Sequence, residues 1–492
     1  MTASERFPHP PTDHGPDQLA EHTYDLIVLG GGSTGEVLAG RAAGGGLSVV
    51  VVESELVGGD CSYWACMPSK ALLRPVEALS DVRGMDGAAQ AVTGELDVPA
   101  VLARRDSFTS GWNDSGQVDW LDSTGVALVR GQGRLTGAPR EVEVVGPAGD
   151  RVTLTARHAV AVCVGSEAAV PPIDGIDSVG AWSSRDATSA GEAPKRLAVV
   201  GGGVVGVEMA TAWSALGSSV TLLAAEYRLL ARMEPEVGER VLTALRDAGV
   251  DVRTGVHVDA VRRAGSTVTA TVSGGEEVDA DEVLVAAGRR MRTSDIGLDT
   301  VGLEPGAALK TDDSMLVRGV DGGWLYSAGD CSGRAMLTHM GKYQARIAGS
   351  AIVARAAGRE AGAQPWSATT ATADAGAVPQ VVFTDPPAAS VGLTAQQARD
   401  AGLRVRVVSL DIAVAGAGLY VDGYSGWACL VVDEDRRVLV GATFIGPAVT
   451  ELLHSATVAV VGEVPVDRLW HAVPSYPTIS EIWLRLLEEY GL

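Results

Sequence analysis

Two glycine-rich turns constrain the fold of this chain more than any other feature. The first begins at Gly30 and the second at Gly201, and both have the pattern G-x-G-x-x-G. Short apolar runs flank both turns, at residues 24–29, 48–53, 197–200 and 220–223. A strand, a tight turn, a helix and a second strand give this pattern. The sequence therefore predicts an α/β fold with two Rossmann-like nucleotide-binding domains, each built on a parallel sheet.

The first turn carries the residues expected of a dinucleotide site. Gly30 permits the tight turn, Gly32 lets a pyrophosphate approach the start of the helix, and Gly35 permits close helix–strand packing. Glu53 ends the following strand, where a carboxylate can bind the hydroxyls of a ribose. A glycine-rich turn without a ligand is the alternative, but the strand, helix and acid around this turn disfavour it.

The second turn differs from the first at the position of the acid. Its glycines are Gly201, Gly203 and Gly206. Ala224 stands where an acid would bind the ribose, and Arg228 and Arg232 follow. Without the carboxylate a 2′-phosphate is not repelled, and an arginine can bind it. We therefore expect NAD(P)H at this turn, with NADPH slightly favoured, unless the two arginines are only solvated charges.

Cys61 and Cys66 occupy positions i and i+5, and Pro68 follows them. On a regular helix their Cα atoms would be roughly 8–9 Å apart, which exceeds the ~7 Å limit for a disulfide. A redox-active pair therefore needs a distorted turn, and Pro68 supports one because proline favours the first turn of a helix. A helix that starts near Met67 would leave Cys66 at its positive end, where the pKa of a thiol is lowered. Two buried structural cysteines are the alternative.

Charge and cysteine usage limit the classes of partner. The chain has 39 Lys and Arg against 61 Asp and Glu, a net charge of −22, and an acidic surface repels nucleic acid and anionic membranes. We see no apolar run long enough to span a membrane, and we predict no metal site. Five cysteines are too few for a disulfide scaffold. Residues 1–22 lack the pattern of a signal peptide, so we expect a flexible tail on a cytoplasmic protein.

The remaining sequence predicts antiparallel strands and a third unit. Residues 141–164 and 252–285 alternate apolar and polar positions around glycine turns, which predicts antiparallel ribbons. Residues 356–377 are rich in Ala, Gly and Thr, which is typical of a connector. Beyond them, strand-like runs and two helical patterns predict an α+β unit, with strands at 381–383, 403–410, 427–432 and 438–445 and helices at 448–461 and 479–490.

The cysteine motif and its neighbours resemble the signature of a known family. The class I pyridine nucleotide-disulfide oxidoreductases, such as dihydrolipoamide dehydrogenase, glutathione reductase and mercuric reductase, carry a motif similar to Gly59-x-Cys61-x4-Cys66-x-Pro68-Ser69-Lys70. Further elements of the family are similar to residues 283–289, to residues 327–330 and to residues 381–393, in the same order. The resemblance runs from Tyr24 to Tyr490.

The resemblance implies a homodimer that binds FAD and NAD(P)H. It also implies a division of the chain into a flexible tail (1–22), an FAD-binding domain in two parts (23–165 and 291–355), an NAD(P)-binding domain (166–290) and a C-terminal α+β dimerisation domain (375–492). Cys61 would be the thiol that attacks the substrate, and Cys66 would lie beside the flavin. Gly59 and Asp330 would belong to the FAD site, with Asp330 on the ribityl chain.

Three more roles follow from the same resemblance. Lys70 and Glu208 would pair near flavin N5, where a buried charge pair tunes the flavin potential. Val204 would gate the nicotinamide pocket. A surface lysine and a helix glutamate without such roles are the alternative.

Two departures from the family bear on the substrate. The family's disulfide reductases end with His-Pro-Thr-x-Ser-Glu, in which the partner subunit's histidine is the acid–base and the glutamate orients it. Here Tyr476 stands in the histidine's place and Glu481 ends the motif, and a phenol with a pKa of about 10 is a poor general base. His471 is a substitute acid–base, unless it only packs or caps. Tyr63 and Trp64, between the cysteines, either narrow the substrate mouth or pack in the core.

The resemblance favours an FAD-dependent oxidoreductase that passes electrons from NAD(P)H through Cys61 and Cys66 to a disulfide, or takes them from a dithiol. The acceptor would be a small molecule or a protein-bound group. An NAD(P)H-dependent reductase of a quinone, a metal or another electrophile is the alternative for which Tyr476 is less of a handicap. A redox-inactive nucleotide-binding scaffold is the alternative from another class, and the intact cysteine pair argues against it.

Overall fold

The chain folds into two units, each drawn from three separate stretches of sequence. The computed structural model describes residues 11–362 and 364–492. Unit 1 contains the described residues up to Pro68 together with Asp106–Ala169 and Arg289–Asp374, and unit 2 contains Ser69–Arg105, Val170–Gly288 and Ala375–Leu492. Residues 1–10 of the predicted tail lie outside the described residues. The finer division into an FAD-binding, an NAD(P)-binding and a dimerisation domain stays a prediction.

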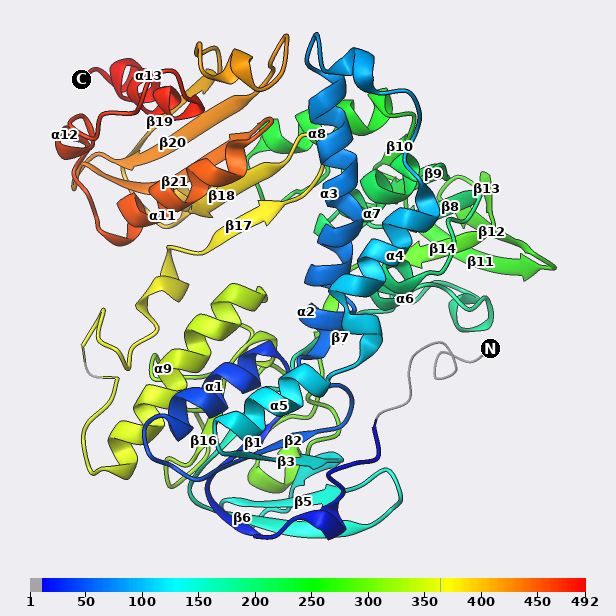
Figure 1. The fold of residues 1–492 in the computed structure, drawn as a ribbon. Helices are drawn as coiled ribbons and strands as arrows, with labels where there is room; N and C mark the ends of the chain where they lie inside the picture. The colour runs from blue at the N-terminus through cyan, green and yellow to red at the C-terminus, as the bar shows by residue number, and fades with distance from the viewer. Residues whose placement is uncertain (1–10, 363) are drawn as a thin grey trace. The chain divides into compact units, whose positions relative to one another are not determined.

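A seven-stranded sheet is the centre of unit 1 (Figure 1). The strands of the unit are β1 (Thr23–Leu29), β2 (Val49–Glu53), β3 (Val126–Arg130), β4 (Gln132–Leu135), β5 (Glu141–Val145), β6 (Arg151–Val162), β7 (Ser166–Ala168), β15 (Arg289–Met291) and β16 (Leu325–Ser327). The order is β3-β2-β1-β6-β5-β4, and β16 pairs with β6 beside this path. Neighbours among β3, β2, β1, β6 and β16 are parallel, whereas β4 and β5 are antiparallel additions. β7 and β15 form a separate ribbon.

Alternate residues of β1 face two different hydrophobic cores. Leu26 and Val28 belong to one cluster of buried residues, and Ile27 and Leu29 belong to another. A parallel sheet that is covered on both faces has continuously apolar strands. This is why the sequence before the first glycine turn has no polar alternation.

Helices α1 and α9 lie side by side against this sheet (Figure 1). The helices of unit 1 are α1 (Ser33–Ala43), α2 (Gly59–Tyr63), α5 (Ser115–Ser123) and α9 (Thr338–Ala356), with a 3-10 turn η7 (Asp330–Ser332). Leu38 of α1 and Ala345 and Ala348 of α9 share one core, and the small alanines allow the close packing of the two helices. Helix α3 (Cys66–Arg83) starts in unit 1 and continues into unit 2, and α4 (Val98–Phe108) runs from unit 2 into unit 1.

Unit 2 contains three sheets. Its strands are β8 (Arg196–Val200), β9 (Ser219–Ala224), β10 (Asp251–Thr254), β11 (Val258–Ala264), β12 (Thr267–Val272), β13 (Glu277–Ala280), β14 (Glu282–Val285), β17 (Pro379–Val382), β18 (Ala388–Gly392), β19 (Val405–Asp411), β20 (Trp427–Asp433) and β21 (Val438–Ile445). The order β10-β9-β8-β14 is a parallel sheet. β11-β12-β13 and β17-β18-β21-β20-β19 are antiparallel.

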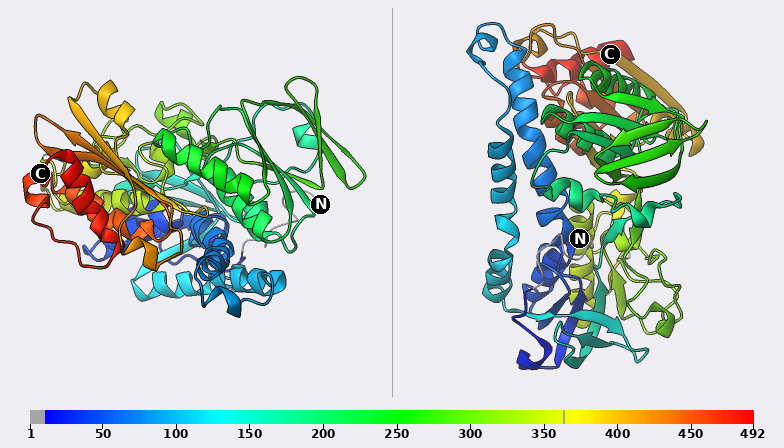
Figure 2. Two further views of the ribbon diagram at one scale, coloured as in Figure 1. Left: turned by 90° about the horizontal axis from the view of Figure 1, so that it is seen from above. Right: turned by 90° about the vertical axis from the view of Figure 1, so that its right-hand side faces the viewer.

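Helices cover the parallel and the five-stranded sheets of unit 2. They are α6 (Ser184–Ser189), α7 (Val204–Ala215), α8 (Pro235–Asp247), α10 (Ala395–Asp400), α11 (Leu452–Val461), α12 (Val466–Leu469) and α13 (Ile482–Tyr490). α7 packs on β8 and β9, and α11 and α13 pack on the five-stranded sheet (Figure 2). The second glycine turn therefore lies on a parallel sheet, as predicted, and the C-terminal segment is α+β, as predicted.

The predicted antiparallel ribbons are only partly right. Within residues 252–285, β10 and β14 join the parallel sheet, and only β11, β12 and β13 are antiparallel. Within residues 141–164, β6 is antiparallel to β5 but parallel to β1 and β16. The first half of β6 alternates between buried and exposed positions, whereas its last four residues are all buried. Alternation thus marks half-covered strand ends and does not report the direction of pairing.

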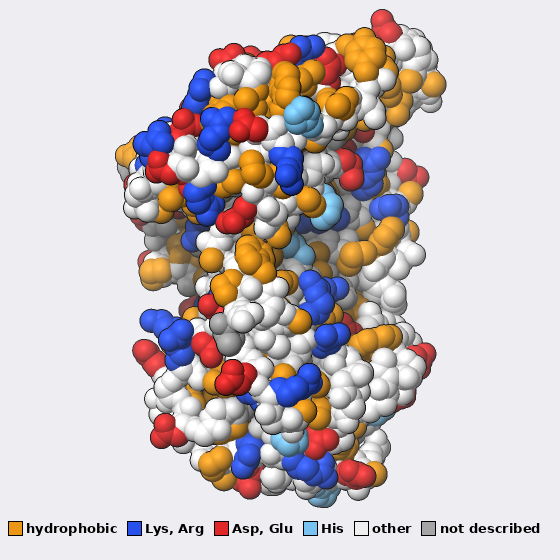
Figure 3. All heavy atoms as spheres, turned by 90° about the vertical axis from the view of Figure 1, so that its left-hand side faces the viewer, with side chains coloured by type: hydrophobic (Ala, Val, Ile, Leu, Met, Phe, Trp, Pro, Cys, Tyr) orange, Lys and Arg blue, Asp and Glu red, His pale blue; other side chains and the backbone are white. Residues whose placement is uncertain are grey.

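No helix in the described part of the chain is both long and apolar enough to cross a membrane. On the face that Figure 3 shows, Lys and Arg side chains are interspersed with Asp and Glu side chains. The charge on that face is therefore mixed rather than gathered into a patch of one sign.

Candidate functional site

The first glycine turn leads from β1 into α1 and leaves no room for side chains. Gly30 has φ = +96°, and a Cβ there would lie 2.5 Å from the carbonyl oxygen of Cys163. A Cβ at Gly35 would lie 1.9 Å from the carbonyl oxygen of Gly30. Gly32 is extended and caps the N-terminus of α1, where unpaired amides and the helix dipole attract an anion. The three glycines therefore give the backbone the shape that a bound pyrophosphate requires.

Glu53 holds the glycine turn from the end of β2. Its carboxylate accepts hydrogen bonds from the amides of Gly31 at 2.6 Å and Glu55 at 2.7 Å, and the residue is buried. Burial raises the pKa of Glu53, and the two amides oppose that rise. Each carboxylate oxygen has a second lone pair, so Glu53 can still accept a bond from a ribose hydroxyl.

A cleft in unit 1 brings the predicted FAD residues together. The cleft is open to solvent, and the backbone of the first glycine turn lies on its wall. The predicted residues that line the cleft are Gly30, Gly32, Glu53, Gly59, Cys61 and Asp330. The glycine backbone and the acid therefore fit the pyrophosphate and a ribose of FAD.

Asp330, in η7, belongs to a charged network on the cleft wall that the sequence analysis missed. The Ser166 hydroxyl donates to Asp330, and Arg289 Nε donates to the Ser166 oxygen at 2.6 Å. Arg289 Nη2 also bonds Asp60 Oδ2 at 3.0 Å, next to Cys61. Arg289 therefore offsets the negative charges of Asp60 and Asp330 in a cleft suited to an anionic dinucleotide. No sequence signal links these residues, because they come from distant segments.

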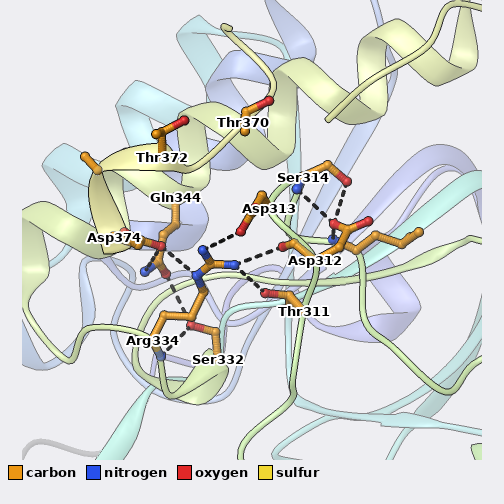
Figure 4. A network of polar contacts seen from close by, with 12 residues as sticks. Thr311, Asp312, Asp313, Ser314, Ser332, Arg334, Gln344, Thr370, Thr372 and Asp374 are labelled. Carbon is orange, nitrogen blue, oxygen red and sulfur yellow. Dashed lines mark hydrogen bonds and ion pairs between the residues drawn. The ribbon is translucent and has the colours of Figure 1, made fainter. Parts of the chain in front are cut away.

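A second network holds the turn that carries Asp330 (Figure 4). Gln344 Oε1 accepts a bond from the Gly329 amide at 2.8 Å, and Gln344 Nε2 donates to Asp374 at 3.1 Å. The Asp374 side chain is buried and pairs with Arg334 Nε at 2.8 Å. Burial raises the pKa of Asp374, and Arg334 and Gln344 oppose that rise. The turn is thus fixed from α9 and from the last residue of unit 1.

The two cysteines lie on either side of a break between helices. α2 ends at Tyr63, Trp64 has the non-helical angles φ = −136° and ψ = 1°, and α3 begins at Cys66. This is the distorted turn that the spacing of the cysteines predicts. Gly59, at the start of α2, has φ = +63°, and a Cβ there would lie 2.8 Å from the Cα of Gly32. The helix that carries Cys61 therefore rests directly on the first glycine turn.

Cys61 and Cys66 are half-buried thiols that are not joined in a disulfide and lie in hydrogen-bond contact. The hydroxyl of Thr338, the first residue of α9, lies 3.2 Å from Cys66 Sγ. The hydrogen bond with Cys66, burial and the charge of Cys66 raise the pKa of Cys61 well above its usual value, whereas Thr338 and Lys342 lower it. Cys66 therefore opposes ionisation of the Cys61 thiol, whereas Thr338 and Lys342 of α9 favour it.

The two bulky residues between the cysteines pack in the core. Tyr63 is 1% exposed and Trp64 is 2% exposed, and their rings meet edge to face with centroids 5.7 Å apart. Trp112 Nε1 donates to the Tyr63 carbonyl at 3.1 Å, and Leu56 completes the cluster. Of the two interpretations, core packing is the one that the structure supports.

In unit 2, the second glycine turn repeats the geometry of the first. A Cβ at Gly201 would lie 2.4 Å from the carbonyl oxygen of Ala286, and a Cβ at Gly206 would lie 1.9 Å from the carbonyl oxygen of Gly201. Gly203 caps α7, and Val204 is the first residue of that helix. A second anion site therefore has the same backbone basis.

The residues beyond β9 support only part of the argument for a 2′-phosphate. Ala224 ends β9, as Glu53 ends β2, so an alanine stands at the position where the first site has its carboxylate. The side chain of Arg228 lies against Gly238 of α8, and its Nη2 donates to the Ala231 carbonyl at 3.2 Å. Arg232 is exposed. Part of the Arg228 side chain is therefore already used in packing and in a hydrogen bond to the backbone.

Lys70 and Glu208 form the predicted pair within unit 2. Lys70 Nζ lies 2.7 Å from Glu208 Oε2, and the Glu208 side chain is only 4% exposed. Glu208 Oε1 accepts a bond from the Phe383 amide at 2.9 Å, and the Lys70 ammonium lies 4.9 Å from the Phe383 ring centroid. Both carboxylate oxygens of Glu208 are thus used, and the ammonium is held on an aromatic face.

The C-terminal motif does not assemble an acid–base pair within one chain. Tyr476 is 75% exposed, and His471 is exposed as well. Glu481 is buried and accepts a bond from Arg485 at 2.7 Å, whereas its Oε2 has no hydrogen-bond partner. In the described part of the chain, no hydrogen bond joins Glu481 to either Tyr476 or His471.

Comparison with family models decides what these features belong to. The model described as "Pyridine nucleotide-disulphide oxidoreductase" matches residues 24–345, more than half of the chain. The chain belongs to the pyridine nucleotide-disulphide oxidoreductase family. The family depends on FAD and a pyridine nucleotide, so the chain is an FAD-dependent oxidoreductase, and the scaffold alternative is not retained. The model of the family's dimerisation domain matches residues 378–486 and supports a homodimer.

Similar proteins cover nearly the whole chain. Dihydrolipoyl dehydrogenase of Thermus scotoductus is 32% identical over 471 residues, which are 93% of this chain and 95% of the relative. Mercuric reductase of Streptomyces lividans is 31% identical over 469 residues, 94% of this chain and 95% of the relative. A solved Cu(II) complex of the HOCl-induced flavoprotein disulfide reductase RclA from Escherichia coli has a TM-score of 0.80 at 23% identity, over 95% of this chain and 99% of that one. This last likeness supports the fold.

Proposed function

We propose that this chain passes electron pairs between NAD(P)H and a disulfide or dithiol through Cys61 and Cys66. The arrangement of the two thiols carries the proposal. They contact each other across a helix break, Cys61 lines the cleft that fits FAD, and Cys66 is the first residue of α3. A thiol at a helix N-terminus is a good leaving group and a good electron donor.

The exchange with a disulfide takes two steps. The Cys61 thiolate attacks one substrate sulfur, the substrate S–S bond breaks, and the first substrate thiolate leaves and takes up a proton. Cys66 then attacks Cys61 Sγ, a Cys61–Cys66 disulfide forms, and the second substrate thiolate leaves and takes up a proton. Two electrons pass from the pair to the substrate. FAD, when bound, supplies two electrons from NAD(P)H that return the pair to the dithiol.

The backbone and side chains of unit 1 are suited to hold FAD. The amides at Gly32 would bind its pyrophosphate, Glu53 a ribose hydroxyl, and Asp330 the ribityl chain. Arg289 would keep the cleft from repelling the dinucleotide. By the family resemblance, Lys70 and Glu208, which pair in unit 2, would provide a positive charge near flavin N5 and so favour a reduced flavin.

NAD(P)H would bind at Gly201, Gly203 and Gly206, with Val204 at the entrance to its pocket. NADPH is slightly favoured because Ala224 replaces the ribose carboxylate and Arg228 is near. Loss of NADPH preference over NADH in Arg228→Ala, measured as the ratio of kcat/KM values, tests this. An unchanged ratio assigns Arg228 to packing alone. A cytoplasmic location is part of the same proposal.

A second candidate function is reduction of a quinone, a metal ion or another electrophile, as in the relatives named mercuric reductase. The observation that favours it is the state of the C-terminal motif. The motif has Tyr476, a poor general base, where the family's disulfide reductases have their acid–base histidine, and in the described part of the chain Tyr476 makes no hydrogen bond with Glu481.

The test compares acceptors with the purified holoenzyme. Steady-state rates with lipoamide, low-molecular-weight disulfides and quinones are measured for wild type, Cys61→Ser and Cys66→Ser. The proposal predicts that wild type reduces disulfides faster than quinones and that both variants lose disulfide reduction. Quinone reduction that exceeds disulfide reduction and survives both substitutions would favour the second candidate.

A further inference from the structure

One side of α9 faces the thiol pair. Thr338 and Lys342 are four residues apart on this helix, so their side chains lie on the same side, one turn apart. The Thr338 hydroxyl is 3.2 Å from Cys66 Sγ. Lys342 is half-buried, and among the described residues no carboxylate lies within ion-pairing distance of its ammonium. The start of α9 therefore places a hydroxyl against Cys66 and a lysine one turn further along the same side of the helix.

The charge of Lys342 acts on Cys61. The Cys66 thiol and burial raise the pKa of Cys61, and Lys342 together with Thr338 is what opposes that rise. A thiol must lose its proton before it can attack a disulfide. Lys342 therefore favours the thiolate form of Cys61, against the effects of Cys66 and of burial.

Glu36 is a second ionisable group near Lys342. It lies in the first turn of α1, and α1 packs against α9. Burial raises the pKa of Glu36 to about 7, Glu53 on β2 adds to the rise, and Lys342 opposes it. The charge of Glu36 also contributes, after burial, to the raised pKa of Tyr63 on α2. Glu36 is therefore neutral below about pH 7 and negative above it.

We propose that Lys342 stabilises the attacking thiolate of Cys61 and that Glu36 sets the strength of this effect. The proposal deepens the proposed function and rests on Cys61 as the attacking thiol. When Cys61 loses its proton to water, Lys342 balances the new charge. When Glu36 is ionised, its negative charge partly cancels the positive charge of Lys342, and Lys342 then stabilises the Cys61 thiolate less. Lys342 and Glu36 are positioning residues, because they act through Cys61.

The experiment measures the pH dependence of Cys61 alkylation. Holoenzyme reduced with NAD(P)H is treated with iodoacetamide over a range of pH, and modified peptides are quantified by mass spectrometry. Lys342→Met should move the midpoint for Cys61 upward by about one pH unit, the lower end of the effect of a nearby opposite charge. Lys342→Arg should restore it. Glu36→Gln should move the midpoint downward, because it leaves the charge of Lys342 unshared.

Lys310→Met is the matched control, since Lys310 is an exposed lysine of the same unit and should leave the midpoint unchanged. Unchanged midpoints in both Lys342→Met and Glu36→Gln would overturn the inference. If Lys342→Met does not fold, a midpoint in Glu36→Gln that fails to fall overturns it alone. Alkylation of wild type at Cys66 with Cys61 unmodified would instead contradict the proposed function.

Discussion

Replacing Gly59 by alanine is expected to weaken FAD binding about ten- to hundredfold. The added Cβ would lie 2.8 Å from the Cα of Gly32, and φ at residue 59 is +63°. Carbon atoms in contact prefer roughly 3.5–4.0 Å, so α2 and the glycine turn must separate by about 0.7 Å or more. That shift disturbs the amides that would bind an anion at α1. Loss of one hydrogen bond to a charged group costs about 1.5–3 kcal/mol, and each 1.4 kcal/mol is about a factor of ten in affinity.

The assay is dilution of the holoenzyme, with FAD release followed by flavin fluorescence. Gly265→Ala is the matched control, because Gly265 has φ = +61° and a Cβ there would meet nothing within 4 Å. It carries the same backbone strain, roughly 1–2 kcal/mol, without the contact to Gly32. The control should therefore lower the melting temperature without changing FAD affinity. An FAD dissociation constant for Gly59→Ala within about twofold of wild type would refute the reasoning.

Three further predictions follow from other parts of the structure. Glu208→Leu should destabilise the protein by about 1–3 kcal/mol, because the Phe383 amide loses its acceptor, and the loss is measured as a lower melting temperature. Glu208→Gln keeps an acceptor and should lower the melting temperature less. Equal losses in the two variants would contradict this. Tyr476→His should raise the rate of disulfide reduction and leave quinone reduction nearly unchanged, and a mutant that loses disulfide reduction would show that Tyr476 is itself a tuned catalytic group. Glu36→Gln should become more stable than wild type as pH rises from 4.5 to 8. The raised pKa of Glu36 means that its contribution to stability is present below about 4.5 and is lost as pH rises through about 7, and a melting-temperature difference that does not change with pH would contradict this.

The local parts of the site could be predicted from the sequence. A Cβ at Gly35 would meet the carbonyl oxygen of Gly30, and a Cβ at Gly206 would meet that of Gly201, so the pattern alone indicates this part of the geometry. The spacing of Cys61 and Cys66 likewise requires a helix break, and the structure has one at Trp64. In each case the cause lies within a few residues of the motif.

The rest of the site depends on contacts between distant segments. Arg289, Ser166 and Asp60 meet on the cleft wall only because β7 and β15 pair and bring their segments together. Lys342 becomes relevant to Cys61 only when α9 packs beside α1. No periodicity or motif reports such contacts, since each residue taken alone is an ordinary charged or polar side chain.

Trapping of thiols tests the central claim most directly. The air-oxidised holoenzyme is incubated anaerobically with and without NAD(P)H, alkylated with iodoacetamide, and mapped by mass spectrometry. The account predicts that Cys61 and Cys66 are protected before reduction and become labelled after it, while the buried Cys163, Cys331 and Cys429 stay unlabelled in both samples. Labelling of Cys61 and Cys66 that does not change with NAD(P)H would contradict electron transfer through this pair.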